Sequence, residues 1–336
     1  MKFDYQKICS DLLSDLKDRQ KEIISRRFGL KTGRHPPPTL PFGRAPRETL
    51  ESIGQDFGIC RERIRQIQED SLNKIKPKLE KYQEIFQTFL KYFKKFGDLK
   101  REDILLEELG SKFQNEVYFL LALNEEFQRF SQNEEFYSFW LTNQNSLKKA
   151  KEAISLLFQK LKEIGKPLTL KEISAFSSLE NSILQSYLEI SKKIQRNPDN
   201  LYGLEDWPEI NPRGIKDKAY LVFKKMEKPL HFSTVANLIE GANLQTVHNE
   251  LIRDERFILV GRGIYALREW GYIPGQVKDV IFAVLKKEGP LPKEEILKKV
   301  LSQRQVKENT ILLNLSNKKY FFKDPQGRYK PKTEII

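Results

Sequence analysis

The side chains that open one amphipathic segment, residues 61–66, combine hydrogen-bond donors and acceptors at helical spacing. Arg61 stands first, and Glu62 and Gln66 lie one helical turn apart on the same face. Arginine can donate two hydrogen bonds to guanine, glutamate can accept one from cytosine, and glutamine can pair with adenine. The chemistry that this set offers is the reading of base edges in a DNA major groove.

The residues around this segment predict the helix-turn-helix that such reading requires. Thr49 can cap a first helix, Gly58 breaks that helix at a turn, and Ile59 is the apolar residue that plugs the turn. A second helix is expected from about Arg61 to Lys76. Its inward-facing residues are Ile64, Ile67, Leu72 and Ile75. The second helix would present its first residues to the bases.

The preceding residues predict a helical region and then an extended loop. Apolar residues recur at helical spacing over residues 8–28, and Gly29 follows where a C-capping glycine belongs. Five prolines and two glycines then fall within residues 31–48. That density excludes a regular helix or an interior strand.

Two sequence blocks, DLKDRQKEIISRRFGL and TLESIGQDFGICRERIRQIQEDSLNKIK, resemble region 4 of the housekeeping-type bacterial sigma factors. The resemblance extends over residues 8–76. It implies a domain that binds the −35 promoter element and docks on the flap of the RNA polymerase β subunit. It also implies base contacts from Arg61, Glu62 and Gln66. Backbone or auxiliary contacts are implied for Arg47, Thr49, Arg63, Arg65 and Lys74.

The chain departs from the sigma pattern at two places. The linker between the two blocks is longer and richer in proline than is usual in that family. Cys60 stands where the family usually has threonine, so the hydroxyl that would cap the second helix is missing. Both departures bear on how the domain docks rather than on its fold.

The remaining residues contain an internal repeat of about 60–70 residues. Its anchors are the leucines of four similar segments, Leu99, Leu168, Leu230 and Leu291. An apolar-periodic helix precedes each anchor leucine, and a short amphipathic helix, a second short helix and two strand-like runs follow it. The strand-like pairs fall at 127–140, 194–204, 257–267 and 320–331. Three helices and a two-stranded wing are the pattern of a winged helix.

We therefore expect a mainly α chain with a sigma-region-4-like helix-turn-helix domain at 1–80 and tandem winged-helix modules with small β-hairpin wings. The modules are expected at 81–145, 146–210, 211–274 and 275–336, the first two being degenerate. Within the third, residues 213–272 resemble the HARE-HTH family. That resemblance implies DNA binding or an adaptor role beside DNA-acting machinery, since the family occurs in RNA polymerase delta subunits, restriction systems and chromatin proteins.

The formal net charge of +13 favours double-stranded DNA as a partner, and the charge is concentrated at the two ends of the chain. Residues 1–80 carry 17 basic and 12 acidic side chains, and residues 276–336 carry 14 and 7. Residues 81–145 carry 8 and 11, so the early modules are expected to be spacers or protein-binding modules. Further DNA-binding candidates are Arg262, Lys307, Asn309, Thr310, Asn314, Lys318 and Arg328.

Several functional classes find no support in the sequence. The two cysteines have no CxxC spacing and the three histidines are scattered, so no metal site is expected. No phosphate-cradling, nucleophile-elbow or zinc-protease motif occurs, so we expect no enzyme activity, no catalytic residues and no cofactor. No apolar run is long enough to cross a membrane. These features favour a cytoplasmic, nucleoid-associated protein.

The leading hypothesis is a sequence-specific transcription regulator, related to sigma factors and acting at promoters with RNA polymerase. Nothing in the sequence matches the sigma domains that bind the polymerase clamp and melt the −10 element, so promoter opening by this chain alone is not expected. One alternative is a delta-like accessory or adaptor subunit of RNA polymerase with weak DNA specificity. Another is the DNA-recognition component of a restriction-modification system.

Overall fold

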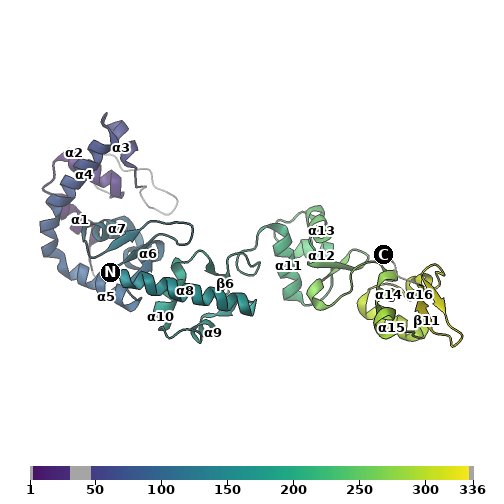
Figure 1. Cartoon of the computed structure of the whole chain (residues 1–336). Helices are drawn as coiled ribbons and strands as arrows, with labels where there is room; N and C mark the ends of the chain where they lie inside the picture. The colour runs from purple at the N-terminus through teal and green to yellow at the C-terminus, as the bar shows by residue number, and fades with distance from the viewer. Residues whose placement is uncertain (1–2, 31–46, 333–336) are drawn as a thin grey trace. The chain divides into compact units, whose positions relative to one another are not determined.

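The computed structural model describes residues 3–30 and 47–332 (Figure 1). The chain divides into two compact units, Met1–Glu205 and Asp206–Ile336. The described residues form a mainly helical fold with four small sheets. Most of the expected proline-rich loop, residues 31–46, lies outside the described residues. Among those that are described, no helix has the length and hydropathy that crossing a membrane requires.

The first unit begins with two helices, and a helix-turn-helix follows them. These first four helices are α1 (Tyr5–Leu13), α2 (Asp18–Phe28), α3 (Leu50–Asp56) and α4 (Arg61–Ile75). The apolar periodicity over 8–28 is continuous, but the helix is interrupted between α1 and α2. Lys17 is extended there, with a ψ of 152°, and α2 begins again at Asp18. Gly29 ends α2 in the left-handed conformation, as the sequence predicts.

Local residues account for the turn of the helix-turn-helix. The Oγ1 atom of Thr49 accepts a hydrogen bond from the Ser52 amide at 3.1 Å and so caps α3. Gly58 turns the chain with a φ of +63°, which a residue with a Cβ rarely adopts. Cys60 precedes α4 without a capping bond. A small core forms beneath the turn from Ile23, Ile53, Ile64 and, partly buried, Leu50, Phe57, Ile59 and Ile67. The predicted helix-turn-helix is therefore confirmed.

Two winged-helix modules complete the first unit, after the 3-10 helix η1 (Lys76–Tyr82). The first consists of α5 (Gln83–Lys95), β1 (Leu99–Arg101), α6 (Glu102–Gly110), η2 (Ser111–Phe113), α7 (Gln114–Leu123), β2 (Gln128–Phe130) and β3 (Phe139–Leu141). The second consists of α8 (Gln144–Ile164), β4 (Leu168–Thr169), α9 (Leu170–Ser174), α10 (Asn181–Ile190), β5 (Ile194–Arg196) and β6 (Leu201–Leu204).

The second unit repeats the same order of elements twice. Its first module consists of α11 (Gly214–Met226), β7 (Leu230–His231), α12 (Phe232–Leu238), α13 (Leu244–Arg253), β8 (Phe257–Gly261), β9 (Ile264–Leu267) and η3 (Arg268–Trp270). The last module consists of α14 (Val277–Glu288), α15 (Lys293–Gln303), α16 (Glu308–Leu315), β10 (Phe321–Lys323) and β11 (Tyr329–Pro331). The predicted fold class is confirmed, while the exact module boundaries stay a prediction.

In three of the modules, the expected two-stranded wing is part of a three-stranded sheet. The anchor leucine supplies the extra strand, because its backbone pairs antiparallel with the second wing strand. Leu99 lies opposite Leu141, Leu168 opposite Tyr202, and Leu230 opposite Tyr265. In the last module Leu291 forms only an isolated bridge to Tyr329. Pro292 follows it and has no amide hydrogen with which to extend the ladder.

One apolar core joins the helix-turn-helix region to the first winged-helix module. Phe28 of α2 packs edge-on against Phe119 of α7, with ring centroids 5.0 Å apart. The buried Asn115 side chain of α7 donates a hydrogen bond to the Gly29 carbonyl at 3.0 Å. The same cluster of buried residues extends from Tyr5 to Trp140. The inner sides of α1 and α2 are thus covered by the winged helix that follows them in sequence.

The neighbouring modules within each unit are also joined by polar contacts. The Ser186 hydroxyl of α10 donates to the Leu99 carbonyl at 2.5 Å, and the buried Lys100 ammonium lies 2.9 Å from the Glu189 carboxylate. In the second unit, the Gln305 amide donates to the Val260 carbonyl at 2.7 Å. Successive modules are therefore docked to each other rather than strung on free linkers.

The shared core predicts that a substitution in α7 destabilises the helix-turn-helix. Phe119→Ala is expected to cost about 3–5 kcal/mol, because it leaves a cavity beside Phe28. The free energy of unfolding and the hydrogen-exchange protection of α2 amides should fall together. Phe176→Ala, at a side chain that is 37% exposed, is the control and should cost much less. Unchanged α2 protection in the Phe119 variant would contradict a shared core.

The second unit is expected to fold when expressed alone. Residues 206–336 hold one apolar cluster in each module and a third on the wing strands β8 and β9, and the hydrogen bond from the Gln305 amide to the Val260 carbonyl also lies within the unit. The amide NMR spectrum of this fragment should be well dispersed. A collapsed spectrum would show that the unit needs the first 205 residues.

Candidate nucleic-acid interface

Helix α4 presents one exposed polar side and one buried side. Ile64, Ser71 and Ile75 face inward, and their burial fixes the rotation of the helix. The exposed predicted residues are Arg61, Glu62, Arg63, Arg65, Gln66 and Lys74. The structure thus brings the three expected base-contacting residues together on the accessible side of one helix.

Neighbouring exposed side chains on α4 pair with one another. The Arg65 guanidinium donates to Glu62 at 2.8 Å through Nη2 and lies 2.9 Å from Glu69. Arg63 donates to the Gln66 Oε1 atom at 3.0 Å. The hydrogen bond from Arg65 lowers the pKa of Glu62, which keeps this carboxylate an acceptor near neutral pH. Exposed pairs of this kind add little stability, so DNA can displace them at small cost.

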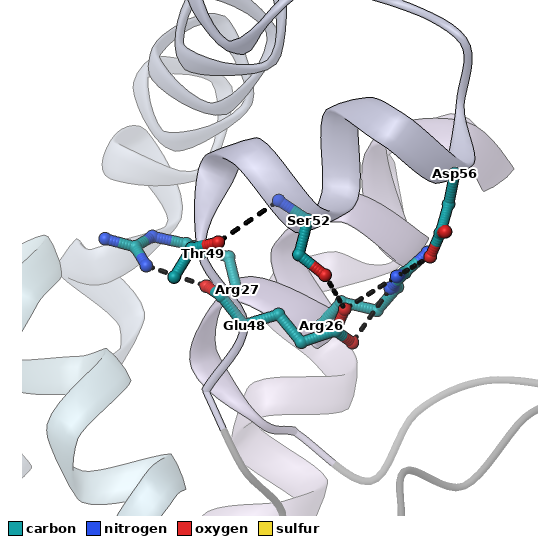
Figure 2. A network of polar contacts seen from close by, with 6 residues as sticks. All are labelled: Arg26, Arg27, Glu48, Thr49, Ser52 and Asp56. Atoms are coloured by element: carbon teal, nitrogen blue, oxygen red, sulfur yellow. Dashed lines mark hydrogen bonds and ion pairs between the residues drawn. The ribbon is translucent and has the colours of Figure 1, made fainter.

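A polar network fixes the start of α3 on α2 (Figure 2). The Arg26 guanidinium donates to both carboxylate oxygens of Glu48, at 2.9 and 2.6 Å, and also pairs with Asp56. The Glu48 carbonyl accepts from Arg27 at 2.7 Å. The hydrogen bond to Glu48 raises the pKa of Arg26 further, so the cation persists at any relevant pH.

Sequence reasoning missed this network, since its members are far apart in the chain. Glu48 follows Arg26 by 22 residues, and Asp56 follows it by 30. The network holds both ends of α3 through one guanidinium. Helix α3 in turn packs on α4, so the network helps to set the orientation of the candidate recognition helix.

Two predicted auxiliary residues next to α3 have partners within the protein. Thr49 uses its oxygen to cap α3, although its hydroxyl hydrogen is left to donate. The Arg47 guanidinium lies 3.7 Å from the centre of the Tyr118 ring and 3.8 Å from the Glu102 carboxylate. Arg47 therefore packs against the first winged-helix module, and the structure does not place it in the exposed row of α4.

The candidates in the second unit fall into two groups. Arg262 is exposed at a wing turn, and Lys307, Thr310 and Lys318 are exposed on and beside α16. Asn314 instead donates to the Thr310 carbonyl of its own helix at 2.8 Å. Arg328 lies 3.2 Å from Asp324 and closes the β10–β11 turn. The structure gives these last two residues internal roles that sequence spacing could not reveal.

The metal-binding groups and the cysteines of the described residues were the other candidates for a site. In those parts of the chain, no group of three or more histidine, cysteine, aspartate or glutamate residues could hold a metal ion. Cys9 is buried and Cys60 is exposed. Burial raises the pKa of the Cys9 thiol well above its ordinary value, so Cys9 stays protonated and unreactive.

Comparisons with known proteins agree with the helix-turn-helix geometry. Residues 12–76 match the family described as Sigma-70, region 4. A segment of 66 residues is 39% identical to the RNA polymerase sigma factor SigA of Listeria monocytogenes. That match covers 20% of this chain and 14% of the relative. The N-terminal segment is thus related to sigma factors, while the chain spans only a small part of the length of the relative that it matches.

The network around Arg26 predicts the effect of removing the Glu48 charge. Glu48→Gln is expected to lower the free energy of unfolding by about 1–3 kcal/mol, because the half-buried guanidinium loses its bidentate partner. Glu51→Gln removes the same charge from an exposed position in the first turn of α3 and is the control. Urea titrations of both variants check this. Equal midpoints for the two variants would contradict a structural role for the network.

Proposed function

We propose that this protein is a sequence-specific DNA-binding transcription regulator that acts at promoters with RNA polymerase. The observation that carries the proposal is the exposed row of Arg61, Glu62 and Gln66 on α4. That helix is oriented by a helix-turn-helix within the segment that matches Sigma-70, region 4. The relative SigA is named as an RNA polymerase sigma factor. We extend a role in transcription from SigA to this chain.

In the proposed complex, the first turns of α4 lie in a DNA major groove. Arg61, Glu62 and Gln66 contact base edges once Glu62 exchanges its pair with Arg65 for a cytosine amino group. Arg63, Arg65 and Lys74 serve phosphates or a protein partner. Thr49 can donate its hydroxyl to a phosphate while still capping α3. Arg47 contributes to phosphate binding only if it leaves the Tyr118 ring.

A delta-like adaptor role for the rest of the chain is the second candidate. The resemblance of residues 213–272 to HARE-HTH modules favours it, as does the internal docking of the first two winged helices. An adaptor would co-purify with RNA polymerase and show little sequence selectivity. A restriction-modification component would instead act with a separate nuclease or methyltransferase.

The proposal predicts different effects for uncharged and charged substitutions on α4. Gln66→Ala should cost about 1–3 kcal/mol for the selected site and leave random DNA unaffected, since no charge is lost. Lys74→Ala should weaken all sequences alike and make the salt dependence shallower by about one unit of slope. The measurement is a selection from random duplexes, followed by titrations of the winner and a scrambled duplex at several salt concentrations.

Matched controls come from exposed residues away from α4. Gln132→Ala and Lys112→Ala remove the same chemical groups from the first winged-helix module and should change neither quantity. If Arg61→Ala, Glu62→Ala and Gln66→Ala leave the selected motif and the specificity ratio intact, α4 does not read bases. The adaptor function would then be the better account.

A further inference from the structure

The third helices of the four winged-helix modules have different surroundings. In the first unit, α7 packs on α1 and α2, and α10 packs on β1. Both helices are buried on most sides. In the second unit, α13 and α16 pack chiefly on helices of their own modules. Their outward faces are therefore open to a partner, as those of α7 and α10 are not.

The outward face of α16 exposes an aliphatic side chain among neutral hydrogen-bonding groups. Ile311 and Leu315 are buried and define the inner side of the helix. On the other side, 76% of Leu313 is exposed to solvent, a large fraction for a leucine. Asn309 stands one turn before Leu313, and Thr310 follows; both are exposed.

The surface around this helix is strongly basic. Residues 306–332 carry seven lysines and arginines but only two carboxylates. One of these carboxylates, Asp324, is already engaged by Arg328. Lys278 and Lys319 flank the Tyr320 ring, with their ammonium groups 5.1 and 5.6 Å from its centre. This charge favours a polyanion as the occupant of the open face rather than an apolar protein surface.

We propose that α16 is a second DNA-reading helix and that it selects A·T-rich duplex. Asparagine can form two hydrogen bonds to adenine, and aliphatic side chains and threonine methyl groups pack on the thymine methyl group. Asn309, Leu313 and Thr310 supply these groups. Arginine does not occur between Glu308 and Leu315, and Lys307 and Glu308, which could read guanine and cytosine, do not lie on the face of Asn309 and Leu313. The lysines beside the helix supply phosphate contacts.

This site is separate from the α4 site and differs from it in chemistry. Helix α4 carries three arginines in its first five residues, whereas α16 carries none. The chain would therefore bind DNA at two points with different base preferences. The inference does not depend on base reading by α4, because the two helices lie in different units.

The test uses the full chain and two duplexes of equal length, one composed of A·T pairs and one rich in G·C pairs, neither containing the motif selected by α4. The wild-type protein should bind the A·T duplex more tightly. The double variant Asn309→Ala, Leu313→Ala should lose about tenfold or more on the A·T duplex and stay unchanged on the G·C duplex. Its salt slope should not change, because no charge is removed.

Charge variants separate base reading from phosphate binding. Lys318→Gln, Lys319→Gln should weaken both duplexes alike and make the salt slope shallower by about two units. Lys286→Gln, Lys287→Gln removes the same charge from the far end of α14 and should have little effect. The A·T preference should persist in the Arg61→Ala, Gln66→Ala variant, which places it outside α4.

Two results would overturn the inference. One is equal binding of the two duplexes by the wild-type chain. The other is an A·T preference that survives the Asn309 and Leu313 substitutions, which would assign it to another part of the protein. Circular dichroism of the double variant confirms folding, and both side chains are exposed, so a loss of binding reports on the surface rather than on the core.

Discussion

The packing of α7 against α1 and α2 is the contact on which the N-terminal unit depends. Phe28 and Phe119 meet at its centre, and Asn115 ties the end of α2 to the same helix. Because this core is continuous, the helix-turn-helix is held by the following module as well as by its own small core. If α4 reads DNA as proposed, a helix held in this way would lose little conformational freedom on binding, which favours affinity and specificity.

The ion pairs of the N-terminal unit differ in their exposure to solvent. One side of α4 is buried, so its charged residues lie on the other side in solvent. Arg65 and Glu62 pair with each other there. Such pairs are weak in water, so they would compete little with DNA. By contrast, the bidentate pair of Arg26 and Glu48 is half-buried and holds the scaffold. Similar ion pairs thus lie exposed on the proposed DNA-reading helix in one place and hold the scaffold in another.

Local sequence signals predicted much of this structure, because their physical causes are local. Gly29 and Gly58 adopt positive φ angles that favour glycine, and Thr49 caps the helix that follows it. The repeat of anchor leucines predicted four modules, whose winged-helix order the structure shows. The third strand was missed, since an isolated leucine has no strand periodicity of its own. The roles of Arg47 and Glu48 depend on partners distant in sequence, which spacing alone does not identify.

We propose above all that the first residues of α4 contact the bases of a specific DNA site. Cys60 immediately precedes α4 and is exposed, whereas Cys9 is 1% exposed, so a thiol-directed DNA-cleaving reagent can be placed at this one point. On the DNA selected by the full-length protein, we expect cleavage confined to one or two adjacent positions at the edge of the selected motif. Diffuse cleavage along the duplex, or cleavage unrelated to the motif, would contradict the account.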